Sequence, residues 1–106
     1  MKRRSVIVTP DAEDDLRKYL SYLRNKKKNP QAVKNVLSDF RETTQKLSDI
    51  ADSIATPESA ELNRRGLKRY NFLRHRYFVL FYTGDDGNVY ITNIFHQLED
   101  YEEKLR

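Results

Sequence analysis

The sequence contains no cysteine and only two histidines, His75 and His96. Without cysteine the chain can form no disulfide bond and supply no thiolate, and two histidines are too few for a typical transition-metal site. It has no run of about 18 or more apolar residues, as a membrane-spanning helix needs, and its start, MKRRSVIVTP, is too polar for a signal peptide. We therefore expect a cytoplasmic protein without metal or organic cofactor. Its 106 residues predict a single domain, residues 1–106.

Positive charge is concentrated in one segment of the chain. The net charge is +4, and residues 63–83 carry six basic side chains and no acidic one. These are Arg64, Arg65, Lys68, Arg69, Arg74 and Arg76. A dense positive field on a small domain is typical of a protein that binds a polyanion or an acidic partner chain. The alternative is a solvated strand and loop, because runs of charge are commonly plain protein surface.

The first half of the chain predicts a strand and two helices. RSVIV, residues 4–8, has β-branched residues in succession and predicts a short strand. Thr9-Pro10 is a typical helix start, with a capping side chain before a proline, and this helix should end near Asn25. Asn29-Pro30 repeats the signal, and Thr56-Pro57 should end the second helix. A short basic turn joins the two helices, so we expect an antiparallel hairpin.

The second half of the chain predicts strands. We expect them over residues 67–74, 76–83 and 88–96, with GDDG as the hairpin turn between the last two. The preceding connection, ESAELNRRG, is polar and has no apolar period. LEDYEEKL, residues 98–105, predicts a short last helix. Together these elements predict an α+β fold, in which an N-terminal strand and a helical hairpin pack on a four-stranded, mainly antiparallel sheet.

Three stretches, in this order, carry a family resemblance. They are VIVTPDAEDDLRKYLSYLRN, then NPQAVKNVLSDF, then YFVLFYTGDDGNVYITNIFHQLEDY with its H-x-x-x-D-Y ending. They resemble the opening strand and first helix, the second helix, and the closing strands of the RelE/ParE superfamily. Its members are bacterial type II toxins, the small basic partners of toxin–antitoxin pairs. The resemblance implies the α+β fold just described.

The resemblance implies one of two activities, and the shared fold does not decide between them. Ribonuclease members cut messenger RNA in the ribosomal A site, and this is the activity that we expect for the chain, with the ribosome and mRNA as partners. Gyrase-directed members bind DNA gyrase and cause DNA breaks without being nucleases. A third alternative is an inactive homologue that only binds its antitoxin. In every case the resemblance implies a cognate antitoxin as partner, in a toxin–antitoxin hetero-oligomer.

RNA cleavage would require a base for the 2′-hydroxyl, cations for the phosphate and a proton donor for the leaving oxygen. The candidates for binding phosphate are Lys68, Arg69, Arg74 and Arg76. The candidate catalytic residues are His96, Tyr101 and Arg76. An imidazole ionises near neutral pH, and the resemblance places working residues at the position of Tyr101.

The same residues also have structural interpretations. His96 stands where a strand ends, and Tyr101 is suited to anchor the last helix. Ribonuclease members place an arginine inside the middle strand where this sequence has Val79, which counts against RNA cleavage. The hairpin register matters too, since a shift of one residue turns a side chain to the other face. A loop from Gly84 to Gly87 puts Arg76 nearly opposite Phe95, whereas a tighter turn around Asp86-Gly87 puts Tyr77 opposite His96.

Overall fold

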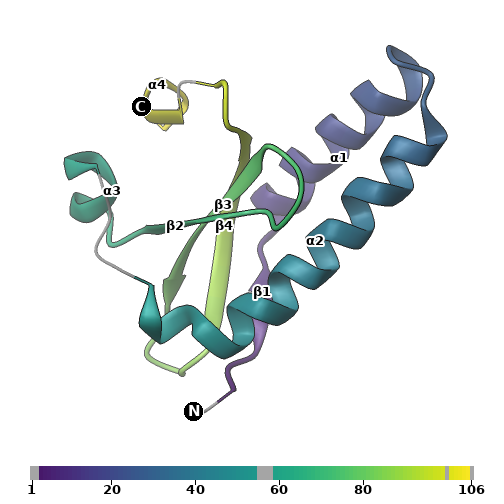
Figure 1. Ribbon diagram of the computed structural model, residues 1–106. Coiled ribbons are helices and arrows are strands. Elements are labelled where there is room, and N and C mark those ends of the chain that lie inside the picture. The colour runs from purple at the N-terminus through teal and green to yellow at the C-terminus, as the bar shows by residue number, and fades with distance from the viewer. Residues whose placement is uncertain (1–2, 55–58, 100, 106) are drawn as a thin grey trace.

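The computed structural model describes residues 3–54, 59–99 and 101–105, which contain four strands, four α-helices and a short 3-10 helix (Figure 1). In chain order these are β1 Val6–Val8, α1 Pro10–Asn25, α2 Pro30–Ile50, η1 Ala51–Ser53, α3 Ala60–Arg64, β2 Lys68–Asn71, β3 Tyr77–Thr83, β4 Val89–His96 and α4 Tyr101–Lys104. Within these ranges no helix combines the length and the apolar character needed to cross a membrane.

The strands form one sheet in the order β1-β4-β3-β2. β3 is antiparallel to both β2 and β4, while β1 runs parallel to β4, with Val6 opposite Val89. The predicted α+β fold with a four-stranded, mainly antiparallel sheet is confirmed. β1 and β2 are shorter than predicted. The register places Tyr77 opposite His96, the pairing expected for the tighter turn.

The caps predicted for the two long helices are present. Thr9 Oγ1 accepts a hydrogen bond from the N–H of Ala12 at 3.3 Å, and Asn29 Oδ1 accepts one from Ala32 at 3.0 Å. Each cap is followed by a proline, whose missing N–H is not needed in the first turn of a helix. α1 ends at Asn25, as predicted.

Two predictions for the middle of the chain are wrong. α2 ends at Ile50, because Ala51–Ser53 tighten into η1, in which Ala51 is buried in the core. The predicted helix end at Thr56-Pro57 lies outside the described residues. The polar connection contains α3, which is capped by the side chain of Ser59 and anchored by buried Leu62. One buried leucine gives no apolar period, so the sequence pattern does not reveal this helix.

Both faces of the sheet are covered. Tyr77, Val79 and Phe81 of β3 belong to the core cluster shared with α1 and α2, whereas Phe78 and Leu80 belong to a second cluster on the opposite face. That second cluster includes residues from α3 and β4, and Leu105 packs against it. Figure 1 accordingly shows the α1–α2 hairpin on one side of the sheet and α3 and α4 on the other. The nearly continuous apolar run of β3 is typical of a strand buried on both faces.

Arg4 ties the start of the chain to two distant segments. Its Nε lies 2.9 Å from Oδ1 of Asp52, and its Nη1 donates to the carbonyl oxygen of Gly87 at 2.8 Å. Gly87 has a φ of +85°, which the hairpin turn requires and which favours glycine. The backbone N–H of Arg4 also donates to Ser48 at 3.1 Å. These contacts fix the N-terminal segment against the end of α2 and the β3–β4 turn.

Candidate functional site

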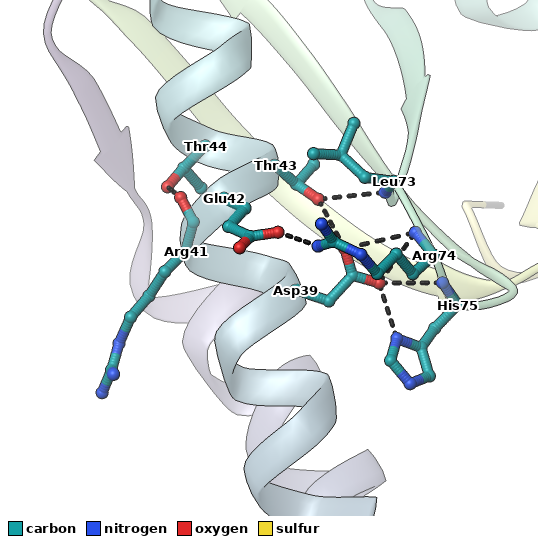
Figure 2. Close-up of polar contacts among 8 residues, drawn as sticks. All are labelled: Asp39, Arg41, Glu42, Thr43, Thr44, Leu73, Arg74 and His75. Atoms are coloured by element: carbon teal, nitrogen blue, oxygen red, sulfur yellow. Dashed lines mark hydrogen bonds and ion pairs between the residues drawn. The ribbon is translucent and has the colours of Figure 1, made fainter.

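A buried carboxylate of α2 holds the connection between β2 and β3. Asp39 is 2% exposed, and its Oδ2 accepts hydrogen bonds from the backbone N–H of Arg74 at 3.1 Å and of His75 at 2.8 Å. The same oxygen lies 2.6 Å from Nδ1 of His75. One helical turn along, Thr43 donates to Asp39 at 3.3 Å and accepts from the N–H of Leu73 at 3.2 Å. Figure 2 shows this network, which holds residues 72–76, called the β2–β3 turn below.

These hydrogen bonds keep Asp39 ionised. Burial raises the pKa of its carboxyl group, but the hydrogen bonds from the His75 ring and from the N–H groups of His75 and Arg74 outweigh burial and lower the pKa. A carboxylate has no proton to donate, so Nδ1 of His75 carries the proton in this contact. The Asp39–His75 pair therefore fixes both the tautomer and the orientation of the imidazole.

The ring of His75 reaches the surface. Its side chain is 33% exposed. Figure 2 shows one ring nitrogen facing Asp39 and the other pointing away from that carboxylate. In a neutral ring this second nitrogen, Nε2, accepts a hydrogen bond or a proton.

The sequence pattern around His75 predicts no role for it, because its partner lies 36 residues earlier in the chain. The signal that could have found the pair is Asp39 itself. It stands on the apolar face of α2, between Val36 and Thr43, and all three residues are buried. A charge at such a position is costly unless it is paired, so it predicts a polar partner from another element.

The two arginines of the β2–β3 turn have different environments. Arg74 forms a salt bridge with Glu42 of α2, which ties a further turn residue to that helix (Figure 2). Arg76 is exposed, and its carbonyl oxygen accepts a hydrogen bond from the N–H of Gln97 at 2.8 Å. Within the described residues its guanidinium group has no hydrogen-bond or ion-pair partner. Arg76 is therefore the arginine of the turn that is available to a ligand.

Lys68 and Arg69 lie on opposite faces of β2. Lys68 pairs with Phe81, and its Nζ donates to the carbonyl oxygen of Ile54 at 3.1 Å, on the side of α1 and α2. Arg69 lies over the ring of Phe78 on the other face, with its guanidinium carbon 3.8 Å from the ring centre. The residues predicted to bind phosphate are thus spread over two faces of the sheet and a turn, and do not form one pocket.

His96 closes the end of β4. Its Nδ1 accepts a hydrogen bond from the N–H of Leu98 at 3.1 Å, and its ring packs edge-on against Tyr77, with centroids 5.2 Å apart. Its own N–H lies 3.0 Å from Oε1 of Glu99 and 3.1 Å from the hydroxyl oxygen of Tyr19. Because Nδ1 accepts, the ring carries its proton on Nε2. This tautomer is the opposite of that of His75.

Glu99 organises the same end of the sheet. It accepts a hydrogen bond from the hydroxyl of Tyr19 and lies 3.0 Å from Nζ of Lys104 in α4. Burial raises the pKa of Glu99, but the contacts from Tyr19, the N–H of His96 and Lys104 together lower it. Burial and the neighbouring carboxylate raise the pKa of Tyr19. Tyr101 begins α4, and its side chain lies outside what the structure describes.

Val79 is fully buried. It is 0% exposed, pairs with Tyr70 and Ile94, and belongs to the core cluster under α1 and α2. The position where ribonuclease relatives are expected to carry an arginine therefore faces the core, where a guanidinium group would need a buried partner. No cluster of three or more histidine or carboxylate side chains suited to a metal ion occurs in the described ranges.

Comparisons with known proteins converge on toxin–antitoxin systems. A family model described as the ParE toxin of the type II toxin–antitoxin system parDE matches residues 6–101. No curated protein matches the sequence. Among solved structures, the chain is similar to a chromosomal ParDE toxin–antitoxin system from P. aeruginosa, with a TM-score of 0.70 and 18% identity, over 91% of this chain and 98% of that chain. It is also similar to the toxin–antitoxin complex RelBE2 from Mycobacterium tuberculosis, with a TM-score of 0.62 and 23% identity, over 93% of this chain and 97% of that chain.

Proposed function

The chain belongs to the ParE toxin family of type II toxin–antitoxin systems, and we propose that it stops growth by binding DNA gyrase and not by cutting RNA. The fold it shares with the ParDE and RelBE2 structures does not separate these two activities. The proposal rests instead on where the candidate catalytic residues lie.

The observation that supports gyrase binding is that His96 and Arg74, two of the groups expected to act on RNA, have other partners. Nδ1 of His96 is taken by the N–H of Leu98, and Arg74 is paired with Glu42. Lys68 and Arg69 face opposite sides of the sheet. A phosphodiesterase needs its base and its cations within reach of one phosphate. A chain that poisons gyrase needs a binding surface and no assembled catalytic site.

We propose a cognate antitoxin as the second partner. Both solved structures to which the chain is similar are described as toxin–antitoxin assemblies. The chain carries a net charge of +4, with six basic and no acidic residues between positions 63 and 83. An acidic or amphipathic antitoxin segment would complement that surface.

One observation favours an mRNA endoribonuclease as a second candidate. His75 and Asp39 form a pair 2.6 Å apart, with Nε2 of the ring directed away from the carboxylate, and exposed Arg76 follows in the sequence. A base oriented by a carboxylate and flanked by a cation suits the removal of a proton from a hydroxyl group. If the chain cleaves RNA, we therefore expect His75 and not His96 to be the base.

Two assays with the purified chain separate the candidates. Gyrase binding predicts inhibition of DNA supercoiling and accumulation of gyrase-linked DNA breaks, while mRNA in a cell-free translation extract stays intact. Addition of the antitoxin should reverse both gyrase effects. Cleavage of ribosome-bound mRNA with gyrase unaffected would contradict the proposal and support the second candidate. In that case His75→Ala should abolish the cleavage.

A further inference from the structure

The β2–β3 turn is held by contacts from one helix to consecutive residues. Thr43 accepts from the N–H of Leu73, and Asp39 accepts from the N–H groups of Arg74 and His75. The side chains of Arg74 and His75 are held as well, the first by Glu42 and the second by Asp39 (Figure 2). Burying the Asp39 carboxylate is costly unless all its hydrogen bonds form. The network therefore selects one conformation of the turn.

The side chains of Leu73 and Arg76, which the turn displays, do not contribute to this network. Leu73 is 45% exposed, and the guanidinium group of Arg76 has no partner in the described part of the chain. The ring of His75 uses only Nδ1 for the contact with Asp39. An exposed apolar side chain and an unpaired arginine in the same ordered turn are a composition found in protein interfaces, where arginine is enriched.

We propose that the β2–β3 turn is a preformed recognition element that docks on an acidic surface of the target protein. Leu73 enters an apolar pocket of that protein, and Arg76 pairs with a carboxylate at the rim of the pocket. The inference rests on the proposed function, because gyrase is the target protein that it names. A turn that is already ordered loses little conformational freedom on binding, which favours affinity.

A protein surface complements these side chains better than a nucleic-acid backbone does. Phosphate oxygens are acceptors, whereas Leu73 requires apolar contact and Nε2 of a neutral His75 is itself an acceptor. The other cation of the turn, Arg74, is already paired with Glu42. One available cation beside an exposed leucine therefore matches an apolar pocket with an acidic rim.

Four single variants of the full chain test the proposal in the gyrase supercoiling assay. Leu73→Ser and Arg76→Glu change the turn, while Tyr22→Ser and Lys34→Glu make comparable changes at exposed positions of α1 and α2. For the turn variants we expect the concentration for half-inhibition to rise about tenfold or more, as for the loss of an interface hot spot. The controls should stay within about twofold of wild type, as for ordinary surface changes. All four positions are exposed, so thermal melting should show folded chains.

Each outcome bears on a different claim. Inhibition by the turn variants equal to wild type would overturn the inference and leave gyrase as target. If wild type itself fails to inhibit gyrase, the proposed function is wrong, and growth arrest on expression of the same variants decides on the turn. Arrest by the controls but not by the turn variants would then support a recognition element, and arrest by all four would overturn it. If the turn variants lose binding to labelled duplex DNA in parallel with inhibition, the partner is a nucleic acid and the docking proposal is wrong.

Discussion

At the β2–β3 turn the ring of His75 donates Nδ1–H to a carboxylate, whereas at the end of β4 the ring of His96 accepts a hydrogen bond from the backbone. The two imidazoles therefore hold opposite tautomers, so that Nε2 is an acceptor in the first and a donor in the second. Position in the sequence drew attention to His96, which ends a strand. The hydrogen-bond partner instead identifies His75 as the ring that a carboxylate orients, with its other nitrogen directed away from that carboxylate.

The carboxylates beside these histidines differ in burial. The side chain of Asp39 is 1% exposed and that of Glu99 is 25% exposed. Asp39 accepts hydrogen bonds from two backbone N–H groups and from the ring of His75. Glu99 accepts hydrogen bonds from one backbone N–H and from the Tyr19 hydroxyl, and it forms an ion pair with Lys104. If the carboxylate is removed, water can accept part of the hydrogen bonds that Glu99 accepts, but few of those that Asp39 accepts. The two sites should therefore respond unequally to the loss of their carboxylate.

The largest effect is expected from Asp39→Ala. It leaves the N–H groups of Arg74 and His75 without an acceptor and should lower the free energy of unfolding by about 3 kcal/mol. Glu99→Ala should lower it by about 1 kcal/mol, because water reaches that site. Urea unfolding of both variants beside wild type measures the two losses, and Asp39→Asn, which keeps one acceptor oxygen, should lie between them. Equal losses would mean that burial does not distinguish the two sites.

A smaller contrast is expected from the hydroxyl groups that support each carboxylate. Thr43→Val removes the acceptor for the N–H of Leu73 at a buried position and should cost about 2 kcal/mol. Tyr19→Phe should cost about 1 kcal/mol, because Glu99 still accepts from the N–H of His96. Thermal melting of the two variants compares them directly. A larger loss for Tyr19→Phe would reverse the ranking of the two sites.

The smallest effect is expected when the pH is lowered, which changes the contribution of Asp39 to stability. The pKa of Asp39 is lowered in the folded chain, so its stabilisation is complete above the ordinary carboxyl pKa and is lost as the pH falls through the folded value. The stability that wild type has over Asp39→Asn should therefore shrink below about pH 4. Asp15→Asn is the control, because burial raises the pKa of Asp15 and the corresponding difference should grow in acid. Urea unfolding at a series of pH values measures both, and a difference for Asp39→Asn that does not shrink in acid would contradict the assigned hydrogen bonds.

Much of the fold could be predicted because its signals are local. The caps Thr9 and Asn29 accept from N–H groups three residues ahead, so the sequence holds both partners within one turn. α3 could not be predicted, since a single buried residue, Leu62, makes no period. The sequence also left two strand registers open. The observed one includes an irregularity at Leu80 and Phe81, which no residue pattern specifies.

The candidate site was less predictable than the fold. The contact between Asp39 and His75 joins residues 36 positions apart, and it exists only after α2 has packed against the sheet. A count of basic residues identified Arg76 as a candidate, but it could not show that Arg76 is unpaired within the described residues, whereas Arg74 forms a salt bridge with Glu42. The roles assigned to His96 and Tyr101 stay predictions. Side-chain pairing decides which charges are available, and pairing is set by tertiary structure.

The parallel pairing of β1 with β4 determines at what stage of synthesis folding can be completed. Val6 pairs with Val89, and Arg4 reaches the carbonyl of Gly87 across 83 residues of sequence. Contacts between residues so far apart in sequence form late, because closing a long loop costs conformational entropy before the contacts are made. As the chain leaves the ribosome N-terminus first, β1 has no strand to pair with until β4 has emerged. The fold of this toxin therefore cannot be completed before residues 89–96 have been translated.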